Sequence, residues 1–208
     1  MTAGRGIAHS EETPARNSGL LHGVQLWVAL PGSDRDVPPA FAQHADLPVV
    51  IDGGLRATVV MGELAGAVSP ARCYTPLVGA EITLADGSDV RLSLRSDFEY
   101  AVLALDGAPT VDGVALKAGP LLYLGAGSTS VRFATGSAAR VLLLGGEPFA
   151  ERLVMWWNFV ARDHDEIVEA RAAWADGSRF GDVHTYDGDP MPAPPMPITR
   201  LLPRGRVR

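Results

Sequence analysis

The sequence predicts an all-β protein with one late helix, and three observations support this prediction. Short apolar runs recur through the middle of the chain, between residues 47 and 144. Turn sequences rich in Gly and Asp separate these runs, and no helical periodicity lies between them. Short strands at this spacing are typical of a sandwich, a jelly roll or a barrel. An alternating α/β fold is disfavoured because it would need a helix between its strands.

The expected strands follow one another along the chain. Residues 22–30 form the first apolar run and predict a buried strand that ends at Pro31-Gly32. Two further runs flank Asp52-Gly53-Gly54, a sequence typical of a hairpin turn. These two strands are expected at residues 47–51 and 56–61, and the later ones at 78–84, 90–94, 100–105, 121–124, 131–134 and 141–144.

A helix is expected at residues 163–176. Asp163 and Glu166 can form a capping box at its start, and Gly177 is a natural stop. One face of this helix is apolar and is expected to pack on the barrel; its members are Ile167, Ala170 and Trp174. Residues 187–197 contain five prolines, so they are expected to form an extended tail laid across a neighbouring surface.

Composition limits the possible functions. The net charge of −6 argues against a general nucleic-acid surface, which is normally basic. Cys73 is the one cysteine, so no internal disulfide can form, and we expect its side chain to be buried. No signal-peptide pattern and no apolar run long enough to span a bilayer occur. We therefore expect a cytoplasmic protein without a membrane partner.

An imidazole and a carboxylate two positions apart lie near the start of the chain, at His9 and Glu11. On an extended segment these side chains would project from the same face, roughly 6–7 Å apart. They could then converge on one metal ion, but a held transition metal usually needs three or four protein donors. No His-x-His pair occurs in this chain to complete the set. The other histidines are expected to be surface residues or non-ligands, namely His22, His44, His164 and His184.

Four phrases in this order resemble the pirin family: MTAGRGIAHSEE, HGVQLWVALP, YTPLVGAEI, and GGEPFAE followed by WWNFVA. The resemblance extends from Met1 to about residue 180. It implies a cupin (jelly-roll) architecture in which this chain holds a partial first barrel, a complete second barrel and one C-terminal helix.

The same resemblance implies the domain boundaries. Residues 1–65 correspond to the later part of the metal-binding first cupin, and 74–150 to a second cupin barrel without metal ligands. Residues 151–180 form a packing segment with the helix, and 181–208 a Pro-rich tail. Met1 coincides with a position inside the domain of relatives, so we expect an internal or misassigned start codon, or a gene that has lost its front.

In the family, the Gly-Arg-Gly-x-x-His-x-Glu segment supplies two of four metal ligands, which here are His9 and Glu11. The cofactor implied is Fe(II) or another divalent transition metal, and Glu11 is the expected catalytic base. Because the other two ligands are missing, we expect weak metal binding and poor activity from the isolated chain.

The resemblance leaves three functions open. The first is an iron-binding oxidoreductase of the quercetin 2,3-dioxygenase type acting on a flavonol-like small molecule. The second is a non-enzymatic regulatory protein that acts through protein partners, and the third is an inactive truncated relative. We also expect self-association through the open edge of the incomplete barrel, because unpaired strand edges are templates for pairing.

Overall fold

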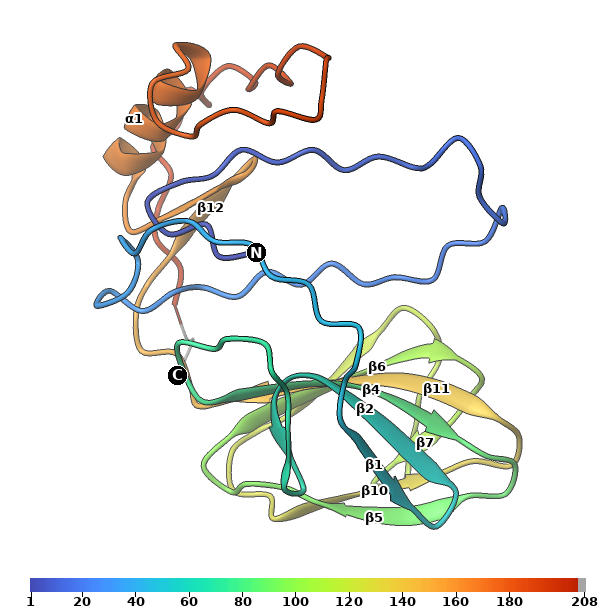
Figure 1. Cartoon of the computed structure of the whole chain (residues 1–208). Coiled ribbons are helices and arrows are strands. Elements are labelled where there is room, and N and C mark those ends of the chain that lie inside the picture. The colour runs from blue at the N-terminus through green and yellow to red at the C-terminus, as the bar shows by residue number, and fades with distance from the viewer. Residues whose placement is uncertain (206–208) are drawn as a thin grey trace. The chain divides into compact units, whose positions relative to one another are not determined.

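The computed structural model describes residues 1–205 and divides into two compact units (Figure 1). Unit 1 comprises Met1–Phe41 and Ala150–Arg208, and unit 2 comprises Ala42–Phe149. Among residues 1–205, no helix has both the length and the apolar character needed to cross a membrane.

Unit 2 consists of two antiparallel sheets. The larger has the strand order β1-β2-β4-β11-β6-β9, with β3 paired to β2, and the smaller has the order β5-β10-β7-β8. Strands distant in sequence are therefore neighbours, as in a jelly roll. The strands are β1 Val49–Asp52, β2 Leu55–Leu64, β3 Ala67–Val68, β4 Leu77–Leu84, β5 Asp89–Ser93, β6 Glu99–Asp106, β7 Thr110–Val111, β8 Val114–Ala115, β9 Leu121–Leu124, β10 Ser130–Ala134 and β11 Ala139–Gly146.

Local sequence explains how these strands form. The β1–β2 hairpin turns at Gly53 and Gly54, whose φ angles of 49° and 89° suit the two-residue turn that matches strand twist. Along β2 the side chains alternate, so that Leu55 and Ala57 are buried while Arg56 between them is exposed. This period of two places one face of each strand in the core between the sheets.

The largest fully buried side chains in the core of unit 2 are apolar. Phe133 on β10, Ile82 on β4 and Leu143 on β11 are each at 0% exposure. The expected strands from 47–51 to 141–144 are therefore confirmed, with bounds that differ by a few residues. Sequence prediction succeeded here because alternation and turn residues are local signals.

Unit 1 has little regular structure. It contains the hairpin of β12 (Val154–Trp156) and β13 (Phe159–Ala161) and the helix α1 (His164–Ala175). The Asp163 carboxylate accepts a hydrogen bond from the Glu166 N–H, 3.0 Å away, and so caps the helix. At the other end Gly177 has a φ of 69°, and its N–H donates to the Trp174 carbonyl. The expected helix, its cap and its stop are confirmed.

The helix α1 packs against the hairpin of its own unit. Its buried residues Ile167 and Ala170 contact Val154, Phe159 and Ala161 of the β12–β13 hairpin, and packing of the same face on the barrel stays a prediction. The physical reason is that one face of the hairpin is apolar and belongs to the same unit. The Pro-rich tail also covers this cluster, since Trp174 Nε1 donates to the Met191 carbonyl at 2.8 Å.

The strand expected at residues 22–30 is not formed. Figure 1 draws this region as coil, and Trp27 and Val28 remain 49% and 48% exposed. An apolar run becomes a strand only when a neighbouring strand satisfies its backbone groups, and no part of residues 1–205 pairs with it.

The compact units are bounded at residues 41–42 and 149–150, and the expected cupin boundaries at residues 65 and 74 stay a prediction. Residues 49–64, expected in the first barrel, form β1 and β2 and pair with β4 in the large sheet of unit 2. The residues from Ala150 onward join residues 1–41 in unit 1. Pairing between β2 and β4, which local patterns do not specify, includes residues 55–64 in the large sheet.

Candidate functional site

The segment that precedes His9 is held in place by its backbone. Arg5 N–H donates to the Val37 carbonyl at 3.2 Å, and Ala8 N–H donates to the Phe180 carbonyl at 2.8 Å. The glycines make this close approach possible. Gly4 has a φ of 53°, and a Cβ there would lie 1.9 Å from the Val37 carbonyl oxygen. The Gly-Arg-Gly pattern is thus required by packing within unit 1.

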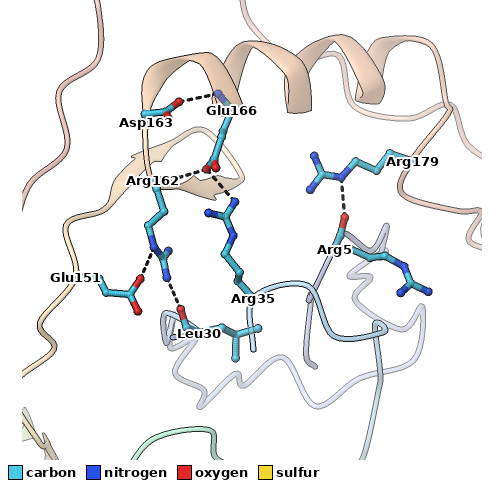
Figure 2. Close-up of polar contacts among 8 residues, drawn as sticks. All are labelled: Arg5, Leu30, Arg35, Glu151, Arg162, Asp163, Glu166 and Arg179. Carbon is cyan, nitrogen blue, oxygen red and sulfur yellow. Dashed lines mark hydrogen bonds and ion pairs between the residues drawn. The ribbon is translucent and has the colours of Figure 1, made fainter. Parts of the chain in front are cut away.

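A second contact fixes the same segment to the residues that follow α1. The Arg179 guanidinium Nε donates to the Arg5 carbonyl at 2.6 Å (Figure 2). The Phe180 ring also lies against Gly6, whose φ is 128° and whose added Cβ would lie 2.8 Å from that ring. The segment before His9 is therefore attached to the C-terminal part of unit 1 on both sides of Gly6.

His9 and Glu11 lie just beyond this attachment, and both are exposed. They belong to no strand, so sheet pairing does not hold them in the same-face arrangement that the sequence suggested. Within residues 1–205, no group of three or more His, Cys, Asp or Glu side chains is placed to hold a metal ion. Two donors alone do not fit a resident transition metal, which takes three or four protein ligands. Their role as ligands stays a prediction.

The remaining histidines do not supply the missing donors. His44 and His184 are exposed, as expected, and neither belongs to a group of three or more possible ligands within residues 1–205. His164 is half-buried at the start of α1, and its Nδ1 accepts a hydrogen bond from the Leu201 N–H at 3.1 Å. That nitrogen is occupied in anchoring the tail.

A network of ion pairs joins the N-terminal segment of unit 1 to its C-terminal part (Figure 2). Arg162 Nε lies 2.6 Å from Glu151 Oε2, and Arg162 Nη2 donates to the Leu30 carbonyl at 2.6 Å. Glu151 Oε1 accepts a hydrogen bond from the Gly32 N–H at 2.6 Å. The end of the 22–30 segment is thereby fixed, although the segment itself is not a strand.

Glu166 extends this network from α1. Its Oε2 lies 2.9 Å from Arg35 Nη2 and accepts a hydrogen bond from the Arg162 N–H at 2.7 Å. The carboxylate thus returns to the residue before the Asp163 cap, which modifies the expected capping box. The hydrogen bond from Arg35 lowers the pKa of Glu166, and the Gly32 N–H followed by the Arg162 guanidinium lowers the pKa of Glu151.

Glu151 and Glu166, the two carboxylates of these ion pairs, are both engaged by guanidinium groups, which disfavours them as catalytic bases. Each carboxylate is paired with a guanidinium, and lowered pKa values keep both ionised and weakly basic. Among these residues, sequence analysis identified only Asp163 and Glu166, as a possible capping box. The partners Arg35 and Arg162 lie 131 and 4 residues from Glu166, and no local pattern links Arg35 to the helix.

Comparisons with known proteins agree with the sequence resemblance. Residues 79–181 match the family model of the pirin C-terminal cupin domain. The chain is 43% identical over 198 residues to a Pseudomonas aeruginosa protein named "Putative quercetin 2,3-dioxygenase PA1205", covering 95% of this chain and 62% of that protein. This chain therefore spans about three fifths of the length of that relative.

A solved structure shares the fold. The crystal structure of quercetin 2,3-dioxygenase from Acinetobacter baumannii is 40% identical, with a TM-score of 0.78 over 83% of this chain and 58% of that chain. The fold is therefore the cupin jelly roll.

The similarity to a pirin-like protein of Caulobacter vibrioides identifies the family of this chain. The two sequences are 38% identical over 199 residues, and the match covers 92% of this chain and 68% of that protein. Because this identity extends over two thirds of the relative, the chain belongs to the pirin family.

Proposed function

We propose that this chain is part of a metal-dependent oxidoreductase of the quercetin 2,3-dioxygenase type. The observation that carries the proposal is the 43% identity, over 95% of this chain, to the Pseudomonas aeruginosa relative. The substrate is a flavonol-like small molecule and the cofactor is Fe(II) or another divalent transition metal. We place the protein in the cytoplasm, because its one cysteine suits a reducing compartment.

In this proposal His9 and Glu11 are two of the metal ligands. Both side chains are exposed and free to meet further donors, and the backbone before them is anchored at Arg5 and Ala8. Glu11 also serves as the base that accepts the proton of a flavonol hydroxyl. Because residues 1–205 contain no third donor beside this pair, a functional site requires donors from additional polypeptide.

Titration with Fe(II) under anaerobic conditions tests the assignment of the ligands. The chain is expected to bind the metal weakly and to lose it on dialysis. His9→Ala and Glu11→Gln are each expected to reduce the affinity at least about tenfold, since even indirect partners of a metal contribute that much. His184→Ala is the matched control, because His184 is also exposed. Equal losses in His9→Ala and His184→Ala would contradict the ligand role.

Oxygen consumption in the presence of quercetin and Fe(II) tests the reaction itself. A low rate that requires both additions and disappears in Glu11→Gln is expected. A rate that is unchanged in Glu11→Gln would remove Glu11 from the reaction.

An exposed apolar segment favours a second function, the binding of a protein partner or of a second copy of this chain. Leu20 and Leu21 are 87% and 97% exposed, and Val24, Trp27 and Val28 are about half exposed. Within the described residues, this segment has apolar side chains and backbone groups without a strand partner, a combination that promotes pairing with another chain. Sedimentation velocity checks this function: a monomer at all concentrations, with no change on Leu21→Ser, would contradict self-association.

A further inference from the structure

A pocket of about 340 Å³ opens in unit 2, whereas His9 and Glu11 belong to unit 1. The hairpin of β2 and β3 forms one side of this pocket, and the connections around residues 69–76 and 95–98 form the rest. Its volume lies within the range of roughly 300–1,000 Å³ typical of small-molecule sites. Apolar side chains line much of it, among them Val68, Leu77 and Phe98.

Two of the polar side chains at the pocket already have partners. The Ser69 hydroxyl donates to the Val60 carbonyl at 2.9 Å and accepts from the Ala71 N–H at 3.2 Å. The Cys73 thiol lies 3.5 Å from the Ala71 carbonyl and is partly exposed, in contrast to the burial that the sequence predicted. These groups shape the wall of the pocket.

Arg95 is the one cation among the residues that line the pocket, and its charge is already neutralised. Its Nε and Nη2 lie 3.0 and 2.5 Å from the two oxygens of Asp97, and Glu147 lies 3.6 Å away. The guanidinium carbon also sits 4.2 Å from the centre of the Phe98 ring. An anionic ligand beside Arg95 would therefore meet two carboxylates at short range, which disfavours it.

Glu63 is the remaining charged residue of the lining. Its side chain is exposed at the end of β2, and none of the ion pairs among residues 1–205 involves it. We propose that this pocket binds a small organic cation, an ammonium group attached to an apolar body. The ammonium pairs with the Glu63 carboxylate, and the apolar body contacts Val68 and Leu77. The proposal is independent of the metal site in unit 1.

Cys73 provides the readout, because it is the one cysteine of the sequence and lines the pocket. Mass spectrometry measures the rate at which iodoacetamide alkylates Cys73 in the full chain. The reaction is run in the presence of one of three probes of similar size: 2-phenylethylammonium, 2-phenylethanol or phenylacetate. The ammonium probe is expected to slow alkylation at about two- to fivefold lower concentration than the alcohol, the factor expected from one exposed ion pair. Phenylacetate is expected to protect least.

Variants at Glu63 distinguish protection that depends on the ion pair with the ammonium group from protection by any molecule that occupies the pocket. Glu63→Gln is expected to abolish the preference for the ammonium over the alcohol, while Glu12→Gln, an equal change of charge at an exposed site in unit 1, retains it. Glu63→Lys is expected to invert the preference toward phenylacetate, an outcome that misfolding would not produce. Lack of protection by any probe, equal protection by cation and anion, or an unchanged preference in Glu63→Gln would each overturn the proposal.

Discussion

The interactions that stabilise the interior of unit 1 differ from those that stabilise the interior of unit 2. In unit 2, two antiparallel sheets enclose a continuous apolar core of which Phe133, Ile82 and Leu143 are fully buried members. In unit 1, the buried cluster around Ile167 is small, and much of the remaining chain is fixed by side chains that bond to distant backbone carbonyls. Unit 1 thus depends more on hydrogen bonds and ion pairs, whereas unit 2 depends on the burial of apolar side chains.

The proposed ligands and the exposed apolar segment both lie in unit 1. Burial of apolar area is the main favourable contribution to folding, and it comes from sheets whose strands find partners. Residues 22–30 have the composition of a strand but form no strand in the described chain, so they contribute little burial. An apolar sequence pattern therefore stabilises a fold only where the pairing strands are present.

Unfolding of the two units can be followed separately, which makes the comparison testable. All four tryptophans lie in unit 1, namely Trp27, Trp156, Trp157 and Trp174. Tryptophan fluorescence therefore reports on unit 1, whereas far-UV circular dichroism is dominated by the strands of unit 2.

The largest effect is expected from Phe133→Ala in unit 2. This ring is fully buried on β10, so its removal leaves a cavity and costs about 3–5 kcal/mol of the free energy of unfolding. Denaturant unfolding followed by circular dichroism measures the loss, and the fluorescence transition is expected to move less. Tyr123→Ala is the matched control at 57% exposure, with an expected change of about 0.5 kcal/mol or less. Similar losses in both variants would contradict the assignment of the core.

A smaller effect is expected from Ile167→Ala in unit 1. Ile167 is fully buried between α1 and the β12–β13 hairpin, but several residues around it are only partly buried, which allows the site to relax. The expected cost is about 2–3 kcal/mol, near the low end for such truncations. The tryptophan fluorescence transition should report it, with Val168→Ala, 40% exposed on the same helix, as control. A shift seen only by circular dichroism would show that the units do not unfold as described.

The smallest effect is expected from acid acting on the polar network of unit 1. The folded-state pKa of Glu166 is lowered, chiefly by its hydrogen bond with Arg35. The stabilisation is therefore fully present above the unfolded pKa of about 4.3 and is lost as the pH falls through the lower folded value. Since the two side chains are 29% and 32% exposed, the pair contributes about 0.2–1 kcal/mol.

Arg35→Gln tests this contribution. The variant is expected to lose part of its stability at pH 7 and to show a weaker dependence on pH below about 5, measured by tryptophan fluorescence. Arg16→Gln is the control, since Arg16 is exposed in the same unit. The same pH dependence in Arg35→Gln and in the parent chain would rule out this pair as the cause.

Sequence analysis identified some residues of the candidate site and missed others, and the ligand role of His9 and Glu11 stays a prediction. The Gly4, Gly6, His9 and Glu11 positions were identified from sequence, because glycine and metal-ligand types at fixed spacing are local features. The attachment of this segment through Arg179 and Phe180 was not predictable, since those residues follow more than 170 positions later, at a sequence separation of 174 for Arg5 and Arg179. The pocket beside Glu63 was missed for the same reason.

The sequence by itself determined the all-β class, the strands of unit 2 with their tight turns, and the helix with its Asp163 cap and Gly177 stop. These features depend on side-chain alternation, turn residues and end groups that lie within a few positions of one another. Only the tertiary structure decided that residues 22–30 form no strand, that β1 and β2 join the large sheet, and that α1 covers the β12–β13 hairpin. Each of these depends on which distant segment is available as a partner, and the energy of pairing exists only once that partner is in contact.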